Sequence, residues 1–169
     1  MRAINIQDGN KSNSKYKTGQ DMKKQTDKYD ILKIENQLCF PLYACSKEVT
    51  RKYRKPLERF NLTYTQYVVM MVLWEYGSMT EKELGERVYL ESGTLAPLLK
   101  RLEKQGYISR IRPKENERCL MISLTDEGAM LKEKALEIPA AMNGCIDLSN
   151  DELMQLKKLL DKALSKMNR

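Results

Sequence analysis

The sequence has no histidine in its 169 residues. Without an imidazole group, Ser-His-Asp and Cys-His catalysis are excluded, and so is every metal site that needs a histidine ligand. No C-x-x-C pair is present either, which excludes a zinc knuckle and a thioredoxin-type motif. The cysteines are Cys39, Cys45, Cys119 and Cys145. We therefore expect no catalytic residue, no metal ion and no cofactor.

Long apolar runs are also missing. The longest run, Tyr67 to Trp74, is too short to span a bilayer, and the N-terminus lacks the apolar core of a secretory signal. We expect a cytoplasmic protein with no membrane partner. In a reducing cytoplasm its cysteines would stay thiols, either inert in a core or available for redox chemistry.

Positive charge is what the chain has in excess, with a net charge of +7. Such a balance favours polyanionic partners without identifying one. Residues 1–30 carry seven Lys or Arg against four Asp, so +3 of this charge lies in a polar segment that we expect to be disordered. Any DNA-binding face of the folded part must therefore concentrate its charge locally.

From Ile34 onward, apolar residues recur every three or four positions and predict a long helix. Pro41 fits the start of this helix, which would put Cys39 at its N-terminal edge, and Pro56 predicts a bend or an end. Cys45 lies on the apolar stripe and is expected in a core. The stripe consists of Leu38, Leu42, Cys45, Val49, Tyr53, Leu57 and Phe60.

Capping patterns predict the next helices. Thr63 with Gln66, and Thr80 with Glu83, each match a capping box before a helix. A further helix is predicted from residue 91 or 92 to residue 105, ended by the glycine at position 106. Two β-rich runs, 107–112 and 118–124, are joined by a charged turn and predict a hairpin.

The C-terminal part is predicted to be helical. Thr125 and Asp126 open a helix that is broken near Pro139 and Gly144. Ser149 and Glu152 cap the last helix, whose apolar stripe is Leu153, Leu156, Leu160, Leu164 and Met167. Burial of this stripe against a second copy predicts a two-fold homodimer.

The element order predicts a mainly α fold with a small β-hairpin wing, which is a winged helix-turn-helix. We assign DNA binding to residues 61–124. Residues 31–60 and 125–169 would form the dimer interface.

The predicted recognition helix begins with the small hydroxyl residues Ser92 and Thr94, and Lys100 lies away from its apolar face. A helix N-terminus favours anions, so these side chains could approach phosphates and base edges. Arg110, Arg112, Lys114 and Arg118 crowd the hairpin loop, where a basic loop can enter the minor groove. Each residue alone could simply cap or solvate its element, but the combination favours binding to double-stranded DNA.

Two cysteines lie at suggestive positions. Cys39 is near the predicted start of a helix, where the dipole lowers the pKa of a thiol. Spacing alone still favours a core role for it. Cys145 lies beside Gly144 in a helix break, from which it could reach a partner thiol.

Four segments resemble the organic-hydroperoxide-resistance regulators (OhrR), a branch of the MarR family of winged-helix repressors. They are Glu35–Ala44 (ENQLCFPLYA), Leu62–Tyr67 (LTYTQY), Leu84–Leu95 (LGERVYLESGTL) and Leu98–Glu103 (LLKRLE). The resemblance implies a dimeric repressor that holds its operator when reduced. It would release the operator when an organic hydroperoxide oxidises one cysteine.

The family's sensing thiol lies in a Gln-Leu-Cys-Phe segment, which corresponds to Cys39. Two tyrosine hydroxyls of the partner subunit that hydrogen-bond it correspond to Tyr53 and Tyr64. Sulfenic acid forms first. Some members then form a mixed disulfide with a low-molecular-weight thiol, and others form an intersubunit disulfide with a second cysteine before the last helix, where Cys145 falls. We favour the two-cysteine switch.

The resemblance also assigns recognition-helix contacts to Ser92, Thr94 and Lys100, and the wing-tip contact to Arg118. Asn116 stands where the family's wing motif has an aspartate. Two alternatives stay open from the residues themselves. One is a MarR-like regulator released by a small aromatic or phenolic ligand without thiol chemistry. The other is an enzyme such as a thiol peroxidase, which no residue except Cys39 supports.

Overall fold

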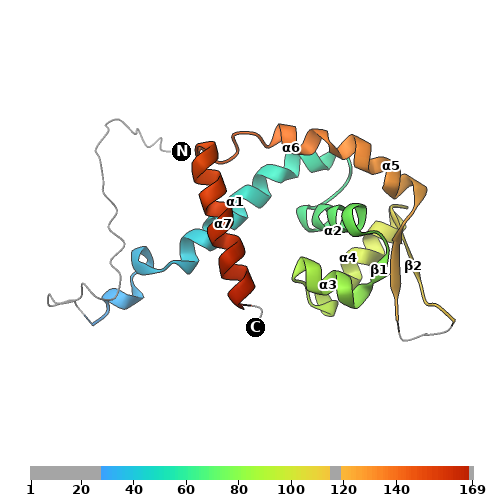
Figure 1. Ribbon diagram of the computed structural model, residues 1–169, viewed down its shortest axis with the longest axis horizontal. Coiled ribbons are helices and arrows are strands. Elements are labelled where there is room, and N and C mark those ends of the chain that lie inside the picture. Colours follow the sequence, from blue (N-terminus) through green and yellow to red (C-terminus); the bar gives the residue numbers. More distant parts are fainter. Residues whose placement is uncertain (1–27, 115–118, 168–169) are drawn as a thin grey trace, which may run out of the picture. The chain divides into compact units, whose positions relative to one another are not determined.

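The computed structural model describes residues 28–114 and 119–167 (Figure 1). Most of the predicted N-terminal extension and the predicted wing-tip Arg118 lie outside these residues. The chain divides into two units, of which one ends at Cys45 and the other begins at Ser46.

The first unit contains two short 3-10 turns, Asp30–Leu32 and Ile34–Asn36, and the start of helix α1 (Cys39–Glu58). The α-helix therefore begins at Cys39 rather than at Ile34. Pro41 is the third residue of α1, where a backbone N–H would have no acceptor within the helix, so the proline costs no hydrogen bond. At the other end, α1 stops two residues after Pro56, near which the sequence predicts a bend or an end.

Three helices form the centre of the second unit, and their predicted starts are confirmed. They are α2 (Tyr64–Tyr76), α3 (Glu81–Val88) and α4 (Ser92–Lys104). Thr63 caps α2 and Thr80 caps α3, each through a complete capping box. Gly106, at a φ of 81°, follows the end of α4 as predicted.

The turn between α3 and α4 is tight because Gly85 has no side chain. A Cβ atom at this position would lie 2.8 Å from the carbonyl oxygen of Leu90, whose own N–H donates to the Gly85 carbonyl at 3.0 Å. The glycine therefore lets the helix-turn-helix close upon itself.

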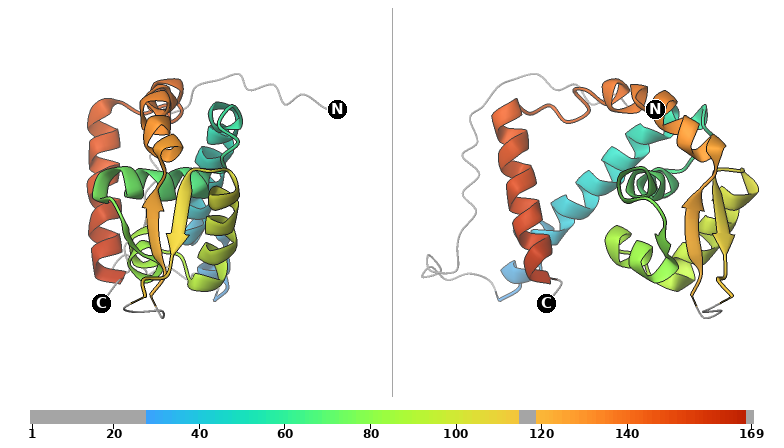
Figure 2. Two further views of the ribbon diagram at one scale, coloured as in Figure 1. Left: turned by 90° about the vertical axis from the view of Figure 1, so that its right-hand side faces the viewer. Right: turned by 45° about the vertical axis from the view of Figure 1, so that its right-hand side comes forward.

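The sheet has three antiparallel strands in the order β1-β3-β2. They are β1 (Met79–Thr80), β2 (Ile108–Ile111) and β3 (Met121–Leu124). Met79 pairs with Ile122, and Ile108 pairs with Leu124. Figure 2 shows β2 and β3 side by side with α4 next to β2. The predicted hairpin is thus confirmed with shorter strands, and β1 extends it.

A single core holds α2, α3, α4 and the sheet together. Its innermost side chains, each at most 2% exposed, include Val69, Met70, Leu84, Leu99 and Ile122. Apolar burial of this extent is the main force that keeps the winged helix-turn-helix folded.

The C-terminal helices are α5 (Asp126–Ala135), α6 (Glu137–Ala141) and α7 (Asn150–Met167). The predicted helix break near Pro139 is confirmed at Leu136, between α5 and α6, and Pro139 itself lies in the first turn of α6, where proline is tolerated. The break at Gly144 is confirmed, since its φ of 71° lies in the segment between α6 and α7. Ser149 and Glu152 form the predicted cap, with the Ser149 N–H donating to Glu152 Oε2 at 2.9 Å.

Two apolar surfaces are exposed among the described residues of the single chain. The prediction that Cys45 lies in the core is wrong for the protomer, where it is exposed, because the described residues of its unit leave the first half of the α1 stripe exposed. None of the residues of α7, all of which are described, is buried. Within residues 28–114 and 119–167, every helix is too short or too polar to cross a membrane.

Candidate functional site

Helix α4 presents one apolar and one polar face. Leu95 and Leu99 on the apolar face are buried, whereas Ser92, Thr94 and Lys100 are exposed as the sequence predicts. Ser92 is the first residue of α4 rather than its cap, because Glu91 occupies the cap position. Both hydroxyl side chains therefore lie in the first turn, where unpaired N–H groups and the dipole favour anions.

The wing carries two exposed cations at the end of β2, Arg112 and Lys114. The sequence predicts that Arg110 is an exposed member of this loop cluster, and it is not. Its Nε atom donates to Glu103 Oε2 at 2.9 Å, and its side chain is only 17% exposed. It therefore ties β2 to α4 instead of facing solvent.

Three tyrosines pack together in the unit that begins at Ser46, and we call them the tyrosine cluster: Tyr53, Tyr64 and Tyr67. The ring centroids of Tyr53 and Tyr64 are 4.8 Å apart, and those of Tyr53 and Tyr67 are 6.1 Å apart. The structure thus brings the two predicted thiol-stabilising tyrosines into contact.

Burial raises the pKa of Tyr53 and of Tyr67, and the neighbouring Tyr64 raises both further. Cys145 adds a smaller contribution in the same direction to the pKa of Tyr53. The phenols therefore stay protonated and able to donate a hydrogen bond near neutral pH.

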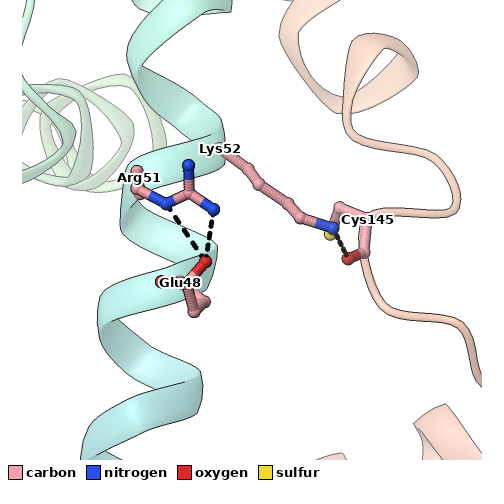
Figure 3. A network of polar contacts seen from close by, with 4 residues as sticks. All are labelled: Glu48, Arg51, Lys52 and Cys145. Carbon is pink, nitrogen blue, oxygen red and sulfur yellow. Dashed lines mark hydrogen bonds and ion pairs between the residues drawn. The ribbon is translucent and has the colours of Figure 1, made fainter. Parts of the chain in front are cut away.

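The predicted sensing and partner thiols belong to different units. Cys39 is exposed and is the first residue of α1. Cys145 is half-buried in the segment after α6, and its carbonyl oxygen accepts a hydrogen bond from Lys52 Nζ at 2.5 Å (Figure 3). The second unit thus contains the Tyr53–Tyr64 pair and Cys145, whereas Cys39 belongs to the first unit.

Sequence reasoning missed the cations around Cys145. Lys52, Lys55 and Arg59 line a cleft together with residues 141–145. Their spacing of three and four residues, from α1 to the residue directly after it, was a usable signal, because side chains so spaced share one face of a helix. Among the described residues, no group of three His, Cys, Asp or Glu side chains is placed to hold a metal ion.

Comparisons with known proteins support a regulatory role. The family model described as "Transcriptional regulator SarA/Rot" matches residues 51–135. The organic hydroperoxide resistance transcriptional regulator of Bacillus subtilis (strain 168) is 51% identical over 133 residues, which cover 79% of this chain and 90% of that protein.

Two solved structures of AbfR are also similar. Reduced AbfR bound to DNA has a TM-score of 0.66 and 38% identity, over 78% of this chain and 91% of that one. Disulfide-formed AbfR has a TM-score of 0.55 and 34% identity, over 79% of this chain and 88% of that one.

Proposed function

The chain belongs to the MarR family of winged-helix transcriptional regulators, in its organic-hydroperoxide-resistance branch, and we propose that it is a redox-controlled DNA-binding repressor. In its reduced form a homodimer holds operator DNA. An organic hydroperoxide oxidises Cys39, and the oxidised dimer releases the operator. We expect this switch to operate in the cytoplasm.

The DNA-binding part of the proposal uses residues 61–124. The first turn of α4 offers Ser92 and Thr94 to a groove, while Lys100 and the wing cations Arg112 and Lys114 neutralise phosphates. Arg118 would serve at the wing tip. These assignments are supported by the exposure of every described member of the set and by a similar protein, AbfR, whose reduced form is bound to DNA.

The dimer in this proposal is formed by residues 31–60 and 125–169. Exposed leucines on α7 and exposed apolar residues at the start of α1 would be covered by the second copy. A two-fold dimer places one α4 helix in each half-site, so the distance between the two helices decides whether the operator is held.

Thiol oxidation begins at Cys39. Its sulfur attacks one oxygen of the hydroperoxide, an S–O bond forms as the O–O bond breaks, and the leaving alkoxide takes a proton to become an alcohol. The hydroxyls of Tyr53 and Tyr64 of the second copy would stabilise the thiolate in place of the missing histidine. One hydroperoxide is used per thiol, so the protein acts as a sensor and not as an enzyme.

One observation supports the proposed disulfide step. The Cys145 carbonyl oxygen accepts a hydrogen bond from Lys52, which directly precedes Tyr53 on α1, and Tyr53 contacts Tyr64. A Cys39 of the second copy bound at these hydroxyls would therefore meet Cys145. The Cys145 thiolate would attack the Cys39 sulfenic sulfur, the S–S bond would form, and hydroxide would leave as water. A low-molecular-weight thiol could cap Cys39 instead in the same manner.

The test uses a Cys39→Ser variant in a DNA-binding assay with cumene hydroperoxide. The variant should bind operator DNA as tightly as the parent, but it should not be released. A Cys119→Ser variant serves as the matched control and should be released normally. Release of the Cys39→Ser variant by hydroperoxide would contradict the proposal. Its saturable release by an aromatic compound would instead support the ligand-controlled alternative.

A further inference from the structure

A cleft of about 650 Å³ lies between the second half of α1 and the segment that follows α6. Lys52, Lys55 and Arg59 line its α1 side, and residues 141–145, which end at Cys145, line the other. All of them belong to the unit that begins at Ser46. The cleft therefore places three cationic side chains beside a cysteine.

The cations of this cleft are only partly neutralised. Arg59 forms an ion pair with Glu137. Lys52 instead donates to the neutral carbonyl oxygen of Cys145 (Figure 3), and Lys55 forms no ion pair with any described residue. The two lysines therefore leave the cleft with a net positive charge.

The neighbouring groups do not cancel this charge. Glu48, an acidic residue one turn before Lys52, is bound by Arg51 at 2.6 Å, as Figure 3 shows. Tyr53, which directly follows Lys52 on α1, stays neutral because burial raises its pKa. An anion that enters the cleft would thus meet cations and a neutral phenol.

We propose that this cleft binds the anionic groups of a low-molecular-weight disulfide and directs it to Cys145, which forms a mixed disulfide with the small thiol. The Cys145 thiolate attacks one sulfur of the small disulfide. A new S–S bond forms as the old one breaks, and the released thiolate takes a proton from water. Cys145 is thereby oxidised and the small disulfide is reduced.

The consequence of this reaction rests on the proposed function. Cys145 capped by a small thiol can no longer close the intersubunit disulfide with Cys39. The cellular pool of small anionic disulfides would then adjust how a hydroperoxide signal is converted into a covalent dimer.

Electrostatics sets the expected selectivity. Lys52 and Lys55 attract an anionic disulfide and repel a cationic one. They also line the same cleft as Cys145, so their charge favours the negative charge that spreads over the sulfurs in the transition state of exchange. Because charges at a solvent-exposed site are screened, we expect each lysine to change the rate by about two- to fivefold.

The test compares oxidised glutathione, which is anionic, with cystamine, which is cationic, on the full-length reduced protein. Peptide mass mapping gives the initial rate of mixed-disulfide formation at each cysteine. Replacing both cleft lysines (Lys52→Gln and Lys55→Gln) should slow the reaction of Cys145 with oxidised glutathione by about four- to twenty-fivefold. The rate with cystamine should stay unchanged or rise.

Two controls accompany the double variant. Arg54→Gln removes an exposed cation from the same helix outside the cleft, and it should leave both rates unchanged. Cys119, mapped in the same samples, should react equally in all variants.

An unchanged rate with oxidised glutathione in the double variant would overturn the proposal. Equal slowing of both disulfides would also overturn it, because that result reports a general change at Cys145 rather than anion binding. The assay contains neither DNA nor hydroperoxide. If these rates contradict the anion-binding proposal, the proposed switch at Cys39 is unaffected. If the Cys39→Ser test contradicts the proposed function, the rates at Cys145 still report whether the cleft binds anions.

Discussion

Helices α4 and α7 have similar apolar spacing but differ in what covers it. Leu99 and Leu102 of α4 are completely buried, whereas Leu156, Leu160 and Leu164 of α7 are 37%, 38% and 42% exposed. Both patterns indicate an amphipathic helix, and neither reveals which chain covers the apolar face. The difference separates residues that are covered within their own chain from residues that the proposed dimer would cover.

The largest effect is expected where one chain completes the packing. Leu99→Ala should lower the free energy of unfolding by about 2–5 kcal/mol, because the lost side chain leaves a cavity in a core that cannot collapse to fill it. Urea denaturation measures this loss. A loss below about 1 kcal/mol would mean that α4 is not held by this core.

A somewhat smaller effect is expected on α7. Leu160→Lys should weaken the dimer by about ten- to a hundredfold, since burial of a leucine contributes about 1.5–3 kcal/mol. Sedimentation across a range of protein concentrations measures the dimer dissociation constant. Lys158→Gln, on another face of the same helix, is the control. Equal dissociation constants for the Leu160→Lys variant and the parent would show that α7 is not part of the interface.

The capping box of α2 is a second test of the region that packs within its own chain. The expected change in stability is smaller than for Leu99→Ala. Thr63→Ala removes the side-chain oxygen that accepts from the Gln66 N–H. The free energy of unfolding should fall by about 1 kcal/mol. Thr65→Ala in the first turn of the same helix should have less effect. If thermal unfolding ranks these two variants in the opposite order, the box contributes little to stability.

Two arginines of the wing test which side chains contact DNA and which are bound within the chain. Arg112→Gln should reduce the slope of log affinity against log salt by about 1, because one phosphate contact is lost. Arg110→Gln should change this slope less, since that cation is bound to Glu103. Fluorescence anisotropy with operator DNA at several salt concentrations measures both. A larger change for Arg110→Gln would reverse the assignment.

The smallest effect concerns pH. Burial holds the pKa of Tyr53 and Tyr67 above the ordinary value near 10. A raised pKa in the folded state contributes stability that is fully present below about pH 10 and is lost as the pH rises through the folded-state pKa. The free energy of unfolding should therefore fall above about pH 10. Tyr53→Phe should make that fall less steep, and an identical slope in urea titrations would contradict this origin.

Local signals explain why much of the fold could be predicted. The capping boxes at Thr63 and Thr80, and the stop at Gly106, act within one turn of chain and appear directly in the sequence. Strand β1 could not be predicted, because two residues cannot show an alternation. Pro139 marked the break between α5 and α6 to within three residues, because proline is favoured in the first turn of the helix that follows a break.

Long-range contacts explain why the site was only partly predictable. The pairing of Tyr53 with Tyr64 came from a family resemblance and not from spacing. Lys52 and Cys145 are 93 residues apart in the sequence, and no local pattern connects them. Cys45 shows the same limit, because an apolar stripe indicates that a face is covered but not which chain covers it.

The link between Cys39 and Cys145 is tested most directly by the intact mass of the protein under non-reducing conditions. The sample is treated with one equivalent of an organic hydroperoxide, and the modified cysteines are mapped. We predict a covalent dimer in which Cys39 of one subunit is joined to Cys145 of the other. An unmodified Cys39 after this treatment would contradict the account.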